Sequence, residues 1–391
     1  MPFERVKNFL AARRGQKAFN ALSQANREIV FYSEDIHSFV HFEEIINGLF
    51  SRYKQEVCYL TSAPDDPLLS RPLPGMQVFY IGEGLVRTTV FRTLKAGLLV
   101  MTMPDLENFH IKRSQIFQVH YLYLFHAMVS THSNYRKAAF DNFDTIFCTG
   151  SFQIDEIRAT ETEYGLKKKN LYSDGYRRLE AIIADVQRHR SLTQDSIDNG
   201  KKTVIVAPSW GDNAILERCG EEIVEVLLEA GYNTIVRPHP MTTKHRPQLI
   251  EAINTRFSEN ENFSLQIDVR DNKTLYESHV MISDWSGVAM EYAFACERPV
   301  VFIDLPKKCN NPEADRIPHT PIEVSIRNKV GRVVSPDSLG ALPAVIEDIY
   351  KDTSKFTHQI RAAREESVFN LGGSIDGAVD EIMRIASTLK S

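Results

Sequence analysis

Short apolar runs recur along the chain, and between them lie stretches whose apolar residues follow the spacing of amphipathic helices. In the first half, the runs that predict strands are Glu28–Ser33, Val57–Thr61, Gln77–Ile81, Gly97–Thr102, Ile116–Leu124 and Thr145–Cys148. The helices predicted around them are Phe42–Tyr53, Arg87–Leu94, Asn134–Phe140 and Arg178–His189. Alternating strands and helices are typical of βαβ units, so this half predicts a Rossmann-like domain with a parallel sheet.

The second half repeats the alternation after a polar linker, Ser191–Lys202. Its predicted strands are Thr203–Ala207, Asn233–Arg237, Ser264–Ile267, His279–Ile282 and Pro299–Ile303. Its predicted helices are Glu217–Ala230, Gln248–Ser258, Asn272–Ser278, Trp285–Ala295 and a mostly helical tail from Pro343 to Ser391. We therefore expect two facing Rossmann-like domains, 1–195 and 196–391, with a central cleft and C-terminal helices. In such sheets, ligands bind at the carboxyl ends of the strands.

Composition narrows the choice of ligand. The 391 residues are 43% hydrophobic and 25% charged, which suits two globular domains. The formal net charge of −5 gives no electrostatic basis for nucleic-acid binding. An anionic ligand must therefore be held locally, by helix N-termini and a few cationic side chains. Five scattered cysteines indicate free thiols in a reducing cytoplasm.

The N-terminus predicts a basic helix. Over residues 3–17, apolar side chains at helical spacing alternate with arginines and lysines. Such a helix either rests on an anionic membrane surface or packs as an ordinary first helix on its domain. No apolar run has the roughly 18 residues needed to span a bilayer. The sequence therefore predicts a cytoplasmic protein that either stays free or associates peripherally with the cytoplasmic face of the inner membrane, and it leaves the oligomeric state open.

A phosphate site is suggested by the segment 280–291. An apolar strand runs into Ser283 and Asp284, and a helix begins near Ser286 and Gly287. Free N–H groups and the helix dipole at such a start bind phosphate, and glycine lets a phosphate approach the backbone closely. Serine and aspartate are also ordinary helix caps, so the pattern alone fits either role.

Two histidines and a serine also follow predicted strands. Arg237 and His239 are held in Arg-Pro-His-Pro, where the guanidinium can bind phosphate and the imidazole can move a proton or stabilise an oxyanion. His126 follows the apolar run of the first domain and faces His239 if the two domains face each other. Ser209 either touches a phosphate or an acceptor, or simply ends a strand. A structural role for His126 remains open on spacing alone.

Other chemistry lacks its motifs. The sequence has no P-loop, no Gly-x-Ser-x-Gly elbow, no Asp-x-Asp pair and no clustered histidines and cysteines. Gly82 and Gly84 lack the third glycine of a dinucleotide fingerprint. We therefore predict neither a metal site nor a cofactor.

Taken together, several short segments resemble the CDP-glycerol glycerophosphotransferase family, which includes teichoic-acid primases and polymerases and related capsule enzymes. The matching segments, in the order of the family, are Phe125–Ala127 with Ser130, Ala139–Gly150, Gly175–Leu179, Ala207–Trp210, Arg237–Pro240, Ser283–Ser286 and Arg298–Phe302. They fall within residues 115–305. The ordered set is more specific than any one of its members.

This resemblance implies a GT-B fold and transfer of glycerol phosphate, or a related polyol phosphate, from a CDP-linked donor. The acceptor would be a hydroxyl of a cell-surface polymer or of a lipid-linked molecule, and CMP would leave. His126 and His239 match the two functional histidines of the family, and Ser283, Asp284 and Ser286 match its donor-phosphate turn. Ser209 matches a position that is often threonine, and Glu291 is either a ribose ligand or a solvated carboxylate.

Two other functions remain open on the sequence. One is a GT-B glycosyltransferase that uses a CMP- or UDP-sugar in capsule or lipopolysaccharide synthesis. The other is a non-catalytic module that binds a nucleotide.

Overall fold

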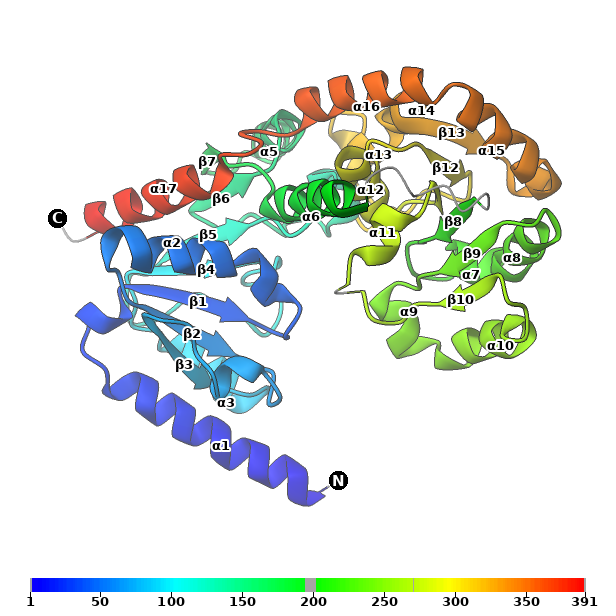
Figure 1. Ribbon diagram of the computed structural model, residues 1–391. Helices are drawn as coiled ribbons and strands as arrows, with labels where there is room; N and C mark the ends of the chain where they lie inside the picture. The colour runs from blue at the N-terminus through cyan, green and yellow to red at the C-terminus, as the bar shows by residue number, and fades with distance from the viewer. Residues whose placement is uncertain (1, 194–201, 270, 390–391) are drawn as a thin grey trace.

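Two parallel sheets organise the chain, and helices cover both faces of each (Figure 1). The computed structural model describes residues 2–193, 202–269 and 271–389. The first sheet has the strand order β3-β2-β1-β4-β5-β6-β7. Its strands are β1 (Ile29–Ser33), β2 (Val57–Thr61), β3 (Met76–Tyr80), β4 (Leu98–Met101), β5 (His120–Leu124), β6 (Thr145–Cys148) and β7 (Asn170–Ser173).

The second sheet has the strand order β10-β9-β8-β11-β12-β13. Its strands are β8 (Thr203–Val206), β9 (Asn233–Val236), β10 (Phe263–Leu265), β11 (Val280–Ser283), β12 (Val300–Ile303) and β13 (Gly331–Val334). This is the order of a Rossmann sheet, and the first sheet has the same order with one added strand. The central strands β1, β4, β11 and β12 are buried along their whole length, as expected of strands covered on both faces. The predicted architecture of two Rossmann-like domains is confirmed.

Helices of the first half surround the first sheet. They are α1 (Pro2–Ala21), α2 (Glu43–Tyr53), α3 (Leu85–Arg92), α4 (Thr131–Asn134), α5 (Ser151–Glu163) and α6 (Arg177–Thr193). Around the second sheet lie α7 (Ile215–Arg218), α8 (Gly220–Glu229), α9 (Pro240–His245), α10 (Pro247–Phe257), α11 (Lys273–Glu277), α12 (Val288–Cys296), α13 (Ile322–Ser325), α14 (Arg327–Val330) and α15 (Leu342–Lys351).

The C-terminal helices join the two halves. α16 (Thr353–Ser367) packs on α12 and α14, and the chain then crosses to the first sheet, where α17 (Ser374–Thr388) lies on α2 (Figure 1). The predicted division at residue 195 lies outside the described residues, as does most of the predicted linker. Because α16 packs on the second half and α17 on the first, the helical tail contacts both halves, although the sequence suggested only the second.

Close packing explains how α17 is held on α2. At Gly48 a side-chain Cβ would lie 2.6 Å from a methyl carbon of Val379, so only glycine lets the helices approach this closely. On the same face, Ile45, Ile46 and Leu49 share a core with Val379 and its neighbours on α17. The C-terminal helix thus completes the core of the first domain.

Some local predictions were wrong. The helix predicted over Asn134–Phe140 is absent: a helical turn ends at Asn134, and turns follow, with Ala138 at a φ of 65°. The single helix predicted over Glu217–Ala230 is two helices, α7 and α8, broken at Cys219. Helix α5 and strands β7 and β13 were not predicted.

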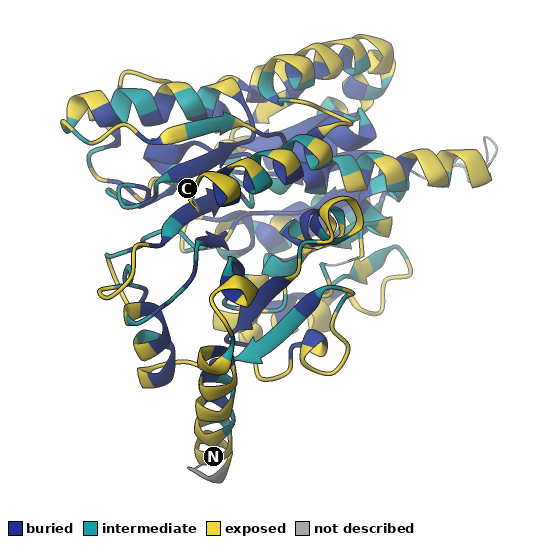
Figure 2. Ribbon diagram, turned by 90° about the vertical axis from the view of Figure 1, so that its left-hand side faces the viewer, coloured by how far each residue is buried: buried dark blue, intermediate teal, exposed yellow. Residues whose placement is uncertain are grey.

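The first helix packs on its domain through its second half, as one of the two predicted arrangements requires. Ala12, Gln16 and Phe19 in its second half are buried, and α1 packs on β3 and α3. In its first half, Val6, Phe9 and Leu10 are about half exposed, and Figure 2 shows the helix as mostly exposed. None of the helices in the described part of the chain is both long and apolar enough to cross a membrane.

Candidate active site

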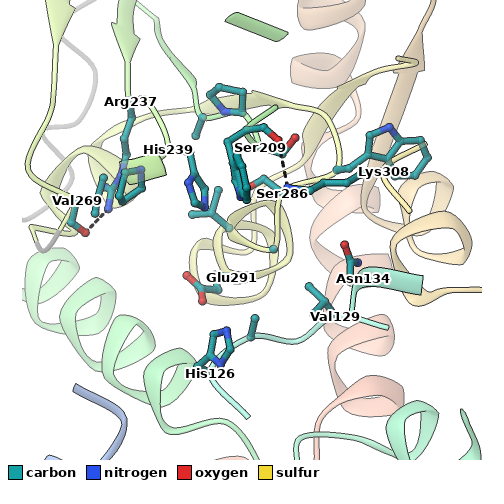
Figure 3. Close-up of a pocket in the computed structure, with 18 of the residues that line it drawn as sticks. His126, Val129, Asn134, Ser209, Arg237, His239, Val269, Ser286, Glu291 and Lys308 are labelled. Atoms are coloured by element: carbon teal, nitrogen blue, oxygen red, sulfur yellow. Dashed lines mark hydrogen bonds between the residues drawn. The ribbon is translucent and has the colours of Figure 1, made fainter. Parts of the chain in front are cut away.

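A cleft of about 380 Å³ lies between the two domains (Figure 3). The second domain lines it with loops that leave the carboxyl ends of β8, β9, β11 and β12, which carry Ser209, His239, Ser286 and Lys308. The strand order reverses between β8 and β11, and this is where open parallel sheets bind ligands. The first domain contributes His126, which follows β5. The site is therefore assembled at the strand ends of both sheets.

His239 enters the cleft at the end of β9 in a defined orientation. Its Nδ1 accepts a hydrogen bond of 3.1 Å from the backbone N–H of Met241 and so caps α9. With Nδ1 acting as an acceptor, the neutral ring carries its proton on Nε2. Burial, and to a lesser extent the charge of Lys308, lowers the pKa of His239 to about 4. At neutral pH His239 is thus an uncharged imidazole with one N–H group to donate.

His126 lies on the opposite wall of the cleft (Figure 3). Its Nδ1 is 3.3 Å from the Tyr123 hydroxyl, and the ring of His41 lies edge-on at 6.2 Å between centroids. Burial lowers the pKa of His126, opposed by the Thr102 backbone and by two carboxylates. His126 is therefore also neutral near pH 7, the state that a general base requires.

Arg237 lines the cleft, but its guanidinium is already engaged. Nη2 donates to the Val269 carbonyl at 2.7 Å, which Figure 3 shows as a dashed line, and Nη1 donates to the Asp271 carbonyl at 3.0 Å and to Thr274 Oγ1 at 3.2 Å. Burial lowers its pKa to about 10. In this arrangement Arg237 ties Val269, Asp271 and Thr274 to the end of β9, whereas the sequence suggested a direct fork onto phosphate.

Ser283 and Asp284 lie behind the cleft wall. The Ser283 hydroxyl donates to the Ala207 carbonyl at 2.7 Å. The Asp284 carboxylate accepts backbone N–H groups from Ser209 at 2.6 Å, Trp285 at 2.7 Å and Ile215 at 3.0 Å. Neither side chain lines the cleft. Their contacts tie the β8 loop to the β11 loop and so place Ser209 beside the start of α12.

Ser286 and Gly287 line the cleft at the start of α12. Helical hydrogen bonding begins with Ala289, which donates to the Ser286 carbonyl. The N–H groups before it belong to a first turn that lacks intrahelical acceptors and can bind an anion. A Cβ on Gly287 would lie 3.4 Å from Val129 of the first domain, which is ordinary van der Waals contact, so the start of α12 lies directly against the first domain.

Glu291 occupies the cleft between the two histidines (Figure 3). Its carboxylate accepts the Tyr176 hydroxyl at 2.7 Å and pairs with Arg178 Nε at 3.1 Å. Both partners belong to the segment that enters α6, which packs on α12. Glu291 is thus part of a polar bridge between the domains within the cleft.

The structure brings seven of the nine predicted site residues to the cleft and places Ser283 and Asp284 behind it. Sequence reasoning missed Arg178 and Lys308 as cleft residues and His41 beside His126. Lys308 follows β12, so its place after a predicted strand was a usable signal. His41 lies in a short 3₁₀ helix, Ser38–His41, and no strand precedes it directly.

Two Rossmann-like domains with a cleft between them form the GT-B architecture. The solved structures agree on the fold. A variant of the wall teichoic acid polymerase TagF aligns with a TM-score of 0.63 at 14% identity, over 100% of this chain and 98% of that chain. The UDP-GlcNAc 2-epimerase of Methanocaldococcus jannaschii, in complex with UDP-GlcNAc and UDP, aligns with a TM-score of 0.57 at 10% identity, over 92% of this chain and 99% of that one.

Among protein families, CDP-Glycerol:Poly(glycerophosphate) glycerophosphotransferase matches residues 86–306. That span is more than half of the chain and holds both histidines and the start of α12. No curated protein sequence matches the chain. The chain belongs to the CDP-glycerol:poly(glycerophosphate) glycerophosphotransferase family and is a transferase. The non-catalytic alternative is thereby set aside.

Proposed function

We propose that this enzyme transfers glycerol phosphate, or a related polyol phosphate, from a CDP-linked donor to a hydroxyl of a polymer or lipid-linked acceptor. The main support for the proposal is that one cleft combines the helix N-terminus of α12, which can bind an anion, with two neutral histidines on its opposite walls. The family match supports CDP-glycerol as the donor. The TagF polymerase, which shares the fold, has been soaked with CDPG.

The residues on the two walls of the cleft suggest how the reaction proceeds. The donor diphosphate lies on the first turn of α12, with Ser286 and Ser209 beside it. An acceptor hydroxyl enters from the first domain and attacks the distal phosphorus. A new P–O bond forms, the bond from that phosphorus to the bridging oxygen breaks, and the electron pair leaves with CMP.

The two histidines have different parts in this scheme. His126 takes the proton of the acceptor hydroxyl, because it lies on the first-domain wall and is neutral. The Nδ1 of His239 is occupied by Met241, so His239 acts through Nε2–H and donates to a phosphate oxygen that gains charge in the transition state. Ser283 and Asp284 act indirectly, by holding the loops.

Product analysis tests the reaction. The protein is incubated with CDP-glycerol, CDP-ribitol, CMP-sugars and UDP-sugars, and nucleotide release and the bond formed to the acceptor are measured. We expect CMP release from a CDP-polyol and a phosphodiester in the product. Turnover of only a sugar nucleotide, with a glycosidic product, would replace this proposal with the glycosyltransferase alternative.

We further propose that the first half of α1 contacts an anionic membrane surface. Val6, Phe9 and Leu10 are exposed, and Arg5, Lys7, Arg13 and Arg14 are exposed along the same helix. Apolar side chains beside basic ones bind anionic lipid interfaces. The five unpaired cysteines fit a reducing compartment, so we place this contact on the cytoplasmic face of the inner membrane.

Sedimentation with vesicles tests the membrane contact. Wild type should sediment with vesicles that contain anionic lipid and should sediment less at high salt. A Phe9→Asp, Leu10→Asp variant should stay in the supernatant and keep its melting temperature, because both side chains are exposed. Equal sedimentation of the variant and wild type would contradict the proposal.

A further inference from the structure

The donor proposed above carries negative charge, and the cleft must supply a cation to match it. Among the described residues, three cationic side chains line the cleft: Arg178, Arg237 and Lys308. Arg178 is paired with the carboxylate of Glu291. The Arg237 guanidinium donates to the carbonyls of Val269 and Asp271. Arg237 therefore has both Nη groups engaged by the protein, and the charge of Arg178 is already balanced by the Glu291 carboxylate.

Lys308 is placed differently. Its Nζ donates one hydrogen bond of 3.1 Å, to the Trp210 carbonyl, and lies 4.3 Å from the centroid of the Trp210 ring. No ion pair links it to a carboxylate within the described ranges. An ammonium group has three N–H donors, and the single bond to Trp210 leaves the others for a ligand.

The position of the ammonium group fits a diphosphate. Figure 3 shows the Lys308 side chain reaching from the β12 loop toward the part of the cleft where Ser209 and Ser286 lie. The first turn of α12 is at the same place. A lysine and a helix N-terminus on one phosphate group supply complementary positive charge.

The electrostatics of the neighbouring groups agree with this placement. Lys308 is the cation whose charge helps to lower the pKa of His239. Burial lowers the pKa of Lys308 itself, while Asp284 and Glu217 oppose that effect from a distance. The ammonium is thus a partly desolvated charge close to the histidine that faces the donor.

We propose that Lys308 binds the diphosphate of the nucleotide donor and stabilises the negative charge that develops on the departing CMP. Trp210 holds the ammonium group in place beside the start of α12. This inference rests on the proposed function for the chemical step, but the binding role needs only a nucleoside diphosphate in the cleft.

Calorimetry with CDP and with cytidine tests the binding role. Lys308→Met keeps the length of the side chain and removes its charge, and Lys308→Arg keeps the charge. Lys307→Met is the matched control, because Lys307 is the exposed neighbour and does not line the cleft. We expect Lys308→Met to weaken CDP binding about 10- to 100-fold, the usual loss for a charge-assisted hydrogen bond. Cytidine binding should not change, and the control should match wild type for both ligands.

Two further readouts separate a phosphate contact from a structural effect. CDP binding by wild type should weaken as salt rises, and this dependence should be smaller in Lys308→Met. Lys308→Arg should recover most of the CDP affinity. If Lys308→Met has a lower melting temperature than wild type, the measurements are repeated with Lys308→Gln. Equal loss of CDP and cytidine binding in both neutral variants, or CDP binding within twofold of wild type, would overturn the proposal.

CMP release from CDP-glycerol is then measured on the same proteins. A lower kcat for Lys308→Met, beyond any rise in KM, supports the role on the departing phosphate. If wild type binds CDP and Lys308→Met does not, but wild type releases no CMP, the proposed function fails and the binding role of Lys308 stands. Wild type that binds no CDP would overturn both.

Discussion

Replacing His239 is the sharpest test of the two-histidine scheme. The ring accepts the Met241 N–H on Nδ1 and presents Nε2–H to the cleft. His239→Ala removes both contacts, whereas His239→Gln removes the ring but can still present an amide N–H. The two variants therefore separate a hydrogen-bond donor from a proton acceptor.

The expected magnitudes follow from these two contacts. Loss of one preorganised donor to a developing oxyanion costs about 10²- to 10³-fold in kcat, so His239→Ala should show that loss. His239→Gln should recover part of it. Loss of the α9 cap should cost about 1 kcal/mol in the free energy of unfolding, so the alanine variant should remain folded.

CMP release is measured from pH 5 to pH 8 for wild type and both variants, with melting temperature as the control for folding. Wild type should lose kcat/KM at acid pH as His126 becomes protonated, with a midpoint below 6.5, because burial lowers the pKa of His126. His239→Gln should keep this acid limb. The scheme would be refuted by His239→Ala with turnover within threefold of wild type, or by His239→Gln with no acid limb, since the second result would make His239 the base.

Three further predictions concern stability. Since the folded pKa of His239 is about 4 against 6.5 for a free histidine, the unfolded chain binds the extra proton, and stability is lost as pH falls from 6.5 toward 4. Over that pH range, the free energy of unfolding measured by urea titration should fall about 2–3 kcal/mol less for His239→Ala than for wild type. An equal fall in both proteins would contradict the lowered pKa of His239. Asp284→Ala leaves three backbone N–H groups without their acceptor, so the free energy of unfolding in urea titrations should fall by about 3 kcal/mol and most of the CMP release should be lost. A fall below about 1 kcal/mol would show that the loops keep their positions without Asp284. Gly48→Ala should lower stability by about 1–3 kcal/mol by overpacking against Val379, and Gly48→Ala, Val379→Ala should recover part of this loss; an unchanged melting temperature for Gly48→Ala would contradict the packing argument.

Much of the fold was predictable from the chain. Strands such as β1 and β11 are continuous apolar runs because both their faces are covered, and such runs alternate with amphipathic helices in both halves. The helix predicted at Asn134–Phe140 failed because its periodicity is short and the backbone turns through a positive φ at Ala138. β7 has only partly buried and exposed residues, so its pattern does not stand out from a loop.

The candidate site was predictable in part, for a related reason. Ser209, His239 and Ser286 follow predicted strands, and the ends of parallel strands meet at one edge of a sheet. Their residue types and order also carried the family resemblance. The sequence by itself therefore determined the two Rossmann-like domains, the strand-end loops that bear the chemistry, and the family.

Only the tertiary structure decided what each side chain does there. Arg237 is tied to loop carbonyls, Asp284 holds backbone N–H groups behind the wall, and Lys308 is left with N–H donors to offer a ligand. It also decided that α17 returns to the first domain, where Gly48 admits it. These outcomes depend on which groups from distant segments come within hydrogen-bond distance. They also depend on which polar groups are buried, because a buried polar group needs a hydrogen-bond partner. Local pattern carries no information about either.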